Sequence, residues 1–235
     1  MASRLVAIHQ PNFFPWLGYF NKLAQADSFI VLDNVQFPKT GGTWMNRVRL
    51  LVNGQPEWVS MPIVRSYHGV RLVREMKINN TIPWRKKLVK TIEQSYGRAP
   101  YFNEVLPVLS RLIENPIDDL REFNVAAFRA LAAAIGLDPA KLIFGSTLNV
   151  KGEATDLLIA MVQAVDGTAY LCGGGAGGYQ EDEKFAAAGI ELIYQHFGHP
   201  TYPQANTEQF YAGLSVIDAL MNCGFEKAHA LIASS

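Results

Sequence analysis

Short apolar runs alternate with helix-like periodicity at the start of the chain. Leu5 to His9 is an apolar run that ends in polar residues and Pro11, which is typical of a buried strand that stops where proline removes a backbone donor. Pro15 to Ala26 carries apolar side chains at helical spacing, and Ser28 to Leu32 is a second apolar run. The first 33 residues therefore predict a β-α-β unit.

The pattern changes after this unit. Asn46 to Val52 and Glu57 to Ile63 flank the dipeptide Asn53-Gly54, a strong turn signal, so we expect an antiparallel hairpin insertion. A helical middle segment follows. Its three predicted helices are Trp84 to Tyr96, Phe102 to Leu112 and Leu120 to Ile135.

Strand-like and helix-like segments alternate again in the last third. The predicted strands are Leu142 to Ser146, Ala169 to Cys172 and Ile190 to Phe197. The predicted helices are Ala154 to Val165, Glu183 to Ala188 and Phe210 to Asn222, which stops at Gly224 before a short final helix. This order predicts an α/β fold with a doubly wound, mainly parallel, Rossmann-like sheet, in one domain that spans residues 1–235.

Composition narrows the classes of protein that fit. At 235 residues and 49% hydrophobic composition, the chain can bury a substantial core. Lys and Arg number 21, as do Asp and Glu, so no global field favours nucleic acid or an anionic membrane. The two cysteines form no CxxC pair, and no segment approaches the roughly 18 to 20 apolar residues of a membrane span. We expect a cytoplasmic protein with a small-molecule substrate and no membrane insertion; a homo-oligomer is left open.

Polar residues follow the first predicted strand. In open parallel sheets, ligands bind beyond the carboxyl ends of the strands. His9, Gln10 and Asn12 occupy this position, and the next helix begins near Trp16 and Tyr19, so that its free backbone donors can face an anion. Because the pKa of histidine is ordinarily near neutrality, His9 is a candidate proton carrier. The alternative is a hydrogen-bonded histidine that fixes the turn.

A second polar segment follows the next strand. Its candidates are Asp33, Gln36, Lys39, Trp44, Asn46 and Arg47. The two cations suit phosphate, the aspartate and glutamine suit a hydroxyl or amine, and the tryptophan suits a ring. The alternative is a solvated loop. Because Asp33 directly follows its strand, we take it with His9 as a candidate catalytic residue.

A glycine-rich run follows the strand that ends at Cys172. Such a run lets the backbone approach a ligand closely, or acts as the hinge of a lid. It lacks the lysine of a GxxxxGK[ST] loop. The remaining binding candidates at this edge of the sheet are Gly173, Gly174, Tyr179, Ser146, Tyr202 and Gln204.

Several kinds of chemistry have little support in the sequence. No GxSxG elbow surrounds Ser146, and neither cysteine has an evident local partner, so covalent nucleophilic catalysis is not expected. The histidines are scattered, and we expect no metal site. Asp218 either faces the pocket or caps a neighbouring loop.

A set of motifs resembles the WbqC-like family. They are Ile8-His9-Gln10-Pro11-Asn12, Pro15-Trp16-Leu17-Gly18-Tyr19-Phe20, Asp33, Val35-Gln36, Asn46-Arg47, Ser146-Thr147-Leu148, Tyr202-Pro203-Gln204 and Leu214 to Asp218. The resemblance covers nearly the whole chain and departs at Cys172-Gly173, where the family often has serine and glycine. Family members occur in gene clusters for O-antigen and other surface glycans, which implies action on an activated or amino sugar.

A fainter similarity in layout links the first 33 residues to nucleotidyltransferase-like folds such as pantothenate synthetase, which joins a carboxylate to an amine through an adenylate. The second histidine of the usual HxGH arrangement is replaced here by Pro15 to Tyr19. The sequence assigns no cofactor, and ATP and an acyl-coenzyme A donor are the two candidates.

The leading hypothesis is a transferase or amide-forming ligase of lipopolysaccharide (O-antigen) sugar biosynthesis. It would transfer an acyl or aminoacyl group to the amine of a nucleotide-linked amino sugar, with His9 at the reacting centre and Lys39 and Arg47 on phosphate. One alternative is a nucleotidyl or glycosyl transferase with a divalent ion on Asp33 and Asp218. The other is a non-catalytic protein that binds a sugar nucleotide during assembly.

Overall fold

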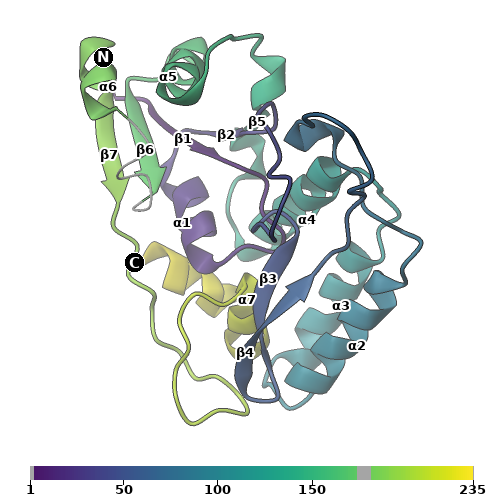
Figure 1. Ribbon diagram of the computed structural model, residues 1–235. Helices are drawn as coiled ribbons and strands as arrows, with labels where there is room; N and C mark the ends of the chain where they lie inside the picture. The colour runs from purple at the N-terminus through teal and green to yellow at the C-terminus, as the bar shows by residue number, and fades with distance from the viewer. Residues whose placement is uncertain (1–2, 174–180, 235) are drawn as a thin grey trace.

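Five parallel strands form the central sheet of the computed structural model, which describes residues 3–173 and 181–234 (Figure 1). Their order across the sheet is β5 (Leu142–Phe144), β2 (Ser28–Val31), β1 (Leu5–His9), β6 (Ala169–Gly173) and β7 (Glu191–Gln195). The chain runs outward from β1 through β2 to β5, and then returns to build β6 and β7 on the other side of β1. The predicted doubly wound parallel sheet is confirmed, and strand order reverses between β1 and β6.

Helices cover both faces of the sheet (Figure 1). On one face lie α1 (Leu17–Gln25), α4 (Leu120–Ile135) and α7 (Val216–Ala233), and on the other lie α5 (Ala154–Ala164) and α6 (Asp182–Ala187). Successive strand side chains point to opposite faces. Ala7 therefore packs in the core beneath α1, whereas Val6 and Ile8 pack against the α5 side. β1, β2 and β6 are buried on both faces, which explains why these three strands are mostly apolar runs.

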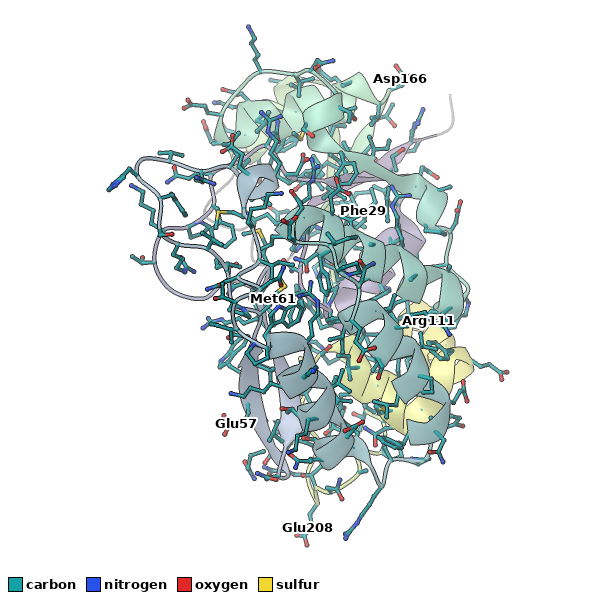
Figure 2. All side chains as sticks on the ribbon, turned by 90° about the vertical axis from the view of Figure 1, so that its right-hand side faces the viewer. Phe29, Glu57, Met61, Arg111, Asp166 and Glu208 are labelled. Carbon is teal, nitrogen blue, oxygen red and sulfur yellow. The ribbon has the colours of Figure 1, made fainter. Side chains whose placement is uncertain are left out.

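The insertion between β2 and β5 contains the hairpin of β3 (Arg47–Val52) and β4 (Gln55–Ser60), followed by helices α2 (Trp84–Tyr96) and α3 (Phe102–Ile113). Asn53 and Gly54 both have positive φ, at 50° and 75°, as a tight primed turn requires. Glu57 of the hairpin and Glu208 lie at the end of the molecule opposite Asp166, which follows α5 (Figure 2). The predicted hairpin insertion and helical middle are confirmed.

Three short 3-10 helices complete the described elements: η1 (Val73–Glu75), η2 (Pro139–Lys141) and η3 (Gly145–Thr147). Ser146 was predicted to end a strand, but β5 stops at Phe144 and Ser146 lies in η3. Its amide and hydroxyl both donate to Asp33, which pulls the chain out of the extended conformation. Among the described residues, no helix is both long enough and apolar enough to span a bilayer.

The helix predicted from Phe210 begins later, at Val216. Gly213 has a φ of 71°, and the Ser215 hydroxyl accepts a hydrogen bond from the Ile217 amide, so Ser215 is the N-cap. The predicted break at Gly224 is present as a kink with a φ of 74°, although helical structure continues on both sides. The apolar periodicity upstream of Ser215 belongs to a packed loop, which residue type alone does not distinguish from a helix.

Candidate functional site

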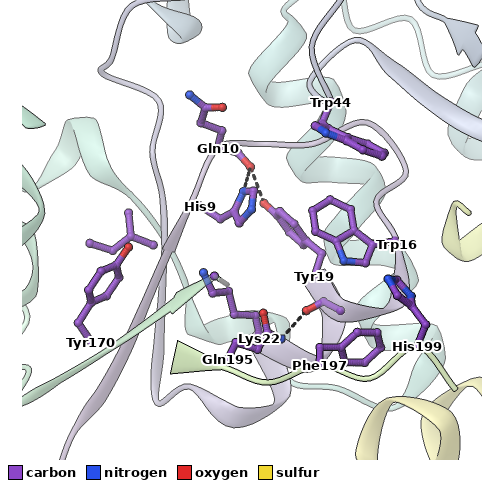
Figure 3. Close-up of a pocket in the computed structure, with 13 residues that line it drawn as sticks. His9, Gln10, Trp16, Tyr19, Lys22, Trp44, Tyr170, Gln195, Phe197 and His199 are labelled. Carbon is purple, nitrogen blue, oxygen red and sulfur yellow. Dashed lines mark hydrogen bonds between the residues drawn. The ribbon is translucent and has the colours of Figure 1, made fainter. Parts of the chain in front are cut away.

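A cavity of about 660 Å³ opens where strand order reverses, at the carboxyl ends of β1, β6 and β7 (Figure 3). Ligands of open α/β sheets bind at this kind of position. Six residues predicted from sequence line it: His9, Gln10, Trp16, Tyr19, Trp44 and Gly173. These six predicted residues therefore share one cavity, and whether they bind a substrate stays a prediction.

His9 is held in one orientation at the end of β1. Its Nδ1 lies 3.1 Å from the carbonyl oxygen of Gln10, which also accepts a hydrogen bond from the Tyr19 hydroxyl at 2.8 Å. The Tyr19 ring packs edge-on against the imidazole, with centroids 4.7 Å apart. Since a carbonyl can only accept, Nδ1 carries the proton and Nε2 is a hydrogen-bond acceptor.

The charge state of His9 follows from its surroundings. Burial, the nearby Lys22 ammonium and a smaller opposing hydrogen bond to Gln10 together lower the pKa of His9 to about 3. The ring is therefore neutral near pH 7. His9 can accept a hydrogen bond from a substrate N–H or O–H, but it holds a transferred proton only weakly. The predicted role of a proton carrier is thus less favourable than a role in orienting a nucleophile.

Lys22 enters the cavity from α1, two turns after Trp16. Its side chain is almost fully buried, and burial lowers its pKa to about 8, with a smaller opposing effect of Cys172. Across residues 3–173 and 181–234, no carboxylate lies within 4.0 Å of its ammonium. Lys22 was not predicted from the sequence as a residue of the site. Its spacing from Trp16 and Tyr19, at six and three positions, was the available signal.

The opposite wall comes from the end of the sheet. Gln195 at the end of β7 donates to the Gly18 carbonyl at 2.8 Å and to Asn21 Oδ1 at 2.7 Å, which ties the strand to α1. Tyr170, Phe197 and His199 complete this wall. These residues were also missed, because their position depends on the strand order and not on a local motif.

Aromatic rings lead outward from the cavity. The ring centroids of Trp16 and Trp44 are 5.3 Å apart, and those of Trp44 and Trp58 are 4.9 Å apart. Trp44 and Trp58 are 39% and 43% exposed, which is unusual for so large a side chain. The Arg47 guanidinium lies 4.2 Å from the Trp58 ring centroid, so Arg47 lies beside these exposed rings and not on the cavity wall; its contact with phosphate stays a prediction. We call Trp44, Trp58 and Arg47 the outer platform.

Asp33 lies at the carboxyl end of β2, but its side chain is committed to a buried network. One of its oxygens accepts from Arg121 at 2.7 Å and from the Ser146 hydroxyl at 2.7 Å, and the other accepts from the Ser146 amide at 2.8 Å. Asp33 is fully buried and does not line the cavity. This arrangement suits a structural carboxylate that fixes the turn after β5, and a catalytic role for Asp33 stays a prediction.

The other predicted residues lie outside the cavity wall. Asn12 and Asn46 are buried. The Asn46 side chain accepts a hydrogen bond from the Thr43 amide and donates one to the Met61 carbonyl. Gln36 and Lys39 are exposed on the loop after β2. Gly174 and Tyr179 lie outside the described residues.

Tyr202 and Gln204 belong to a second buried network around Asp218. Its carboxylate accepts from the Tyr96 hydroxyl at 3.0 Å, from Tyr202 at 2.8 Å and from the Gln204 amide at 2.9 Å. Burial raises the pKa of Asp218, and these hydrogen bonds oppose the shift. Asp33 and Asp218 share none of these partners. Within the described residues, no group of three His, Cys, Asp or Glu side chains is arranged to hold a metal ion.

Comparisons with known proteins found one family model and one relative that match nearly the whole chain. The model of the WbqC-like protein family matches residues 10–230. A protein of Mycobacterium tuberculosis, strain ATCC 25618 / H37Rv, described as "Uncharacterized protein Rv1507c", is 27% identical over 223 residues, which cover 94% of each chain. No solved structure matches the chain significantly.

Proposed function

This chain belongs to the WbqC-like protein family, and from that premise we propose that it is a transferase of bacterial surface-sugar biosynthesis. The proposed reaction transfers an acyl or aminoacyl group to the amine of a nucleotide-linked amino sugar. The observation that carries this proposal is the cavity at the reversal of strand order, with a neutral His9, a buried Lys22 and an aromatic wall. The proposed setting is the bacterial cytoplasm.

The dimensions of the cavity suit such a substrate. Small-molecule sites usually enclose about 300–1,000 Å³, and this cavity of about 660 Å³ falls within that range. Tryptophan and tyrosine rings offer apolar faces for a sugar ring, while Gln10 and Gln195 are polar side chains that can orient hydroxyl groups. A nucleoside base would stack outside the cavity on the outer platform, where Arg47 is a cation for the phosphates.

The chemistry requires a neutral amine beside an acyl carbon. In the proposed reaction, the amine nitrogen attacks the acyl carbon of a thioester, the carbon–sulfur bond breaks, and the amine proton leaves with the thiolate as free thiol. Nε2 of His9 accepts a hydrogen bond from the amine and so directs its lone pair toward the acyl group. Because the ring stays neutral near pH 7, Nε2 keeps the lone pair that accepts this hydrogen bond.

An assay for thiol release tests the proposal. Purified protein is mixed with a nucleotide-linked amino sugar and an acyl-coenzyme A, and thiol release is followed with each substrate omitted in turn. We expect release that needs both substrates and that falls about 100-fold in His9→Ala, because the amine is then no longer oriented. The surface variant Lys86→Met is the matched control and should match the wild type, because Lys86 is exposed on α2.

Other outcomes would favour the alternatives. Replacing the thioester with ATP and a free carboxylic acid tests amide ligation by the same site. Activity that disappears with a chelator and returns with Mg²⁺ would favour a nucleotidyl or glycosyl transferase. Tight binding of a nucleotide sugar, with no turnover and no effect of His9→Ala on the pathway product, would favour a binding protein.

A further inference from the structure

Lys22 is a buried cation whose charge has no protein counter-ion in the described residues. Its side chain is 2% exposed, and the ion pairs among those residues involve other side chains. The ammonium lies 3.9 Å from the position that a Cβ on Gly173 would occupy, at the cavity wall. Figure 3 shows the end of the Lys22 side chain beside the end of β6 and below His9.

Burying a cation without a partner is costly. An isolated ammonium loses the solvation that water gives it, so buried charges are normally paired or bound to a ligand. Leucine or methionine at the same helix position would be buried at a lower free-energy cost, since α1 packs Leu17, Phe20 and Leu23 into the core. A lysine at this place is best explained by a negative partner that arrives with the ligand.

Among the described residues, no carboxylate lies within 4.0 Å of the Lys22 ammonium, and the histidine and tyrosine side chains of the cavity carry no negative charge near pH 7. His9 of β1 is neutral, and burial raises the pKa of Tyr19 on α1 and of Tyr170 on β6 well above its ordinary value. Cys172 of β6 has an opposing effect on the pKa of Lys22 that is smaller than that of burial, and His199 beyond β7 has a pKa lowered by burial. Residues 174–180, which follow β6, contain no Asp or Glu in their sequence.

We propose that Lys22 is the anion-binding residue of the cavity and that its counter-ion is a phosphate or carboxylate oxygen of the substrate. The proposal rests on the proposed function only in taking the cavity as the substrate site. A single ammonium in a neutral aromatic cavity favours a ligand with one anionic group, which would contact Lys22. The ring of the same ligand would pack against Trp16 and Tyr19. A sugar phosphate and a uronic acid both meet this description.

Binding of simple anionic sugars at two pH values tests the proposal. The probes are glucose 1-phosphate and glucuronate, with glucose as the neutral control. Binding is followed by tryptophan fluorescence, since Trp16 and Trp44 line the cavity. With a pKa of about 8, Lys22 is mostly protonated at pH 7 and only about 3% protonated at pH 9.5. The affinity of the wild type for the correct anion should therefore fall about 30-fold between these pH values.

Two variants separate charge from packing. Lys22→Arg keeps its charge at both pH values, because guanidinium is always protonated in proteins, so its affinity should change less than about threefold. Lys22→Met should bind the anion no better than glucose at either pH. A preference for glucose 1-phosphate or for glucuronate identifies the source of the anionic oxygen.

Three results would overturn the proposal: no preference of the wild type for either anion over glucose, an affinity that is unchanged between the two pH values, or a fall in Lys22→Arg as large as in the wild type. The outcome is separable from that of the transferase assay. Thiol release without a role for Lys22 in anion binding would remove the inference alone. Anion binding through Lys22 without any transfer would remove the transferase and leave the inference.

Discussion

Replacing Lys22 by methionine should make the protein more stable at neutral pH. Methionine fits the same volume and carries no charge, so the variant removes the cost of burying an ammonium. The pKa of Lys22 falls from 10.5 to about 8 on folding. Because the unfolded chain then binds more protons between these two values, the stability of the wild type rises with pH across this window.

The size of the effect follows from the same shift. At about 1.36 kcal/mol per pKa unit, a shift of about 2.5 units corresponds to roughly 3 kcal/mol at pH 7 and to roughly 1 kcal/mol at pH 10. Lys22→Met should therefore exceed the wild type in free energy of unfolding by about 3 kcal/mol at pH 7. Comparing variant with wild type at each pH cancels the titration of all other groups.

Urea unfolding at pH 7 and pH 10 measures both differences. Lys22→Arg is the charged control, and it should lack any gain in stability at pH 7. Lys86→Met is the surface control and should stay within about 0.5 kcal/mol of the wild type, because Lys86 is exposed. A Lys22→Met variant that is less stable than the wild type at pH 7, or that shows the same difference at both pH values, would refute the reasoning.

Three further predictions concern the groups around the cavity. Folding lowers the pKa of His9 from 6.5 to about 3, so the unfolded chain is protonated at a higher pH and the wild type loses stability as the pH drops below 6.5. His9→Asn should remove about 3 kcal/mol of this loss at pH 4, as measured by urea unfolding beside the wild type. An equal loss of stability in acid for both proteins would contradict this prediction. Asp33→Asn should cost about 3 kcal/mol of stability because it leaves Arg121 without its buried partner; unchanged stability with complete loss of activity would favour the catalytic role instead. Trp44→Ala should weaken nucleotide-sugar binding by about tenfold in calorimetry, because a base that stacks on a tryptophan contributes roughly 1–3 kcal/mol. Trp58→Ala should give a comparable loss. Full affinity in both variants would exclude the outer platform as the site where the base binds.

The strands and most helices could be predicted because their signals are local. Leu5–His9 is bounded by proline, Asn53-Gly54 requires a tight turn, and Leu120–Ile135 ends at a glycine with positive φ. The start of α7 could not be placed, because only the hydrogen bond from Ile217 to Ser215 and the conformation of Gly213 mark it.

The cavity could be predicted on one side only. His9, Trp16 and Tyr19 are close in sequence and share a motif, whereas Gln195 reaches α1 across 177 positions and depends on the order of the strands. In the sequence alone, Lys22 cannot be told from a lysine on the exposed face of a helix, because its burial depends on how α1 packs against the sheet. Residue type shows which groups are available, and packing decides which of them face one another.

A thermal-shift measurement with nucleotide-linked amino sugars tests most directly whether the cavity is the substrate site. Gly173→Leu places a bulky side chain at the cavity wall, where a Cβ would meet only the Lys22 ammonium, at 3.9 Å, among the described residues. Ala187→Leu on the exposed side of α6 is the matched control.

A ligand at about 100 times its Kd stabilises the native state by about 2.7 kcal/mol, or roughly 5–10 °C in a chain of this size. We predict such a rise in the wild type and in Ala187→Leu, and none in Gly173→Leu. A rise that persists in Gly173→Leu, or no rise in the folded wild type with any nucleotide sugar, would contradict the account.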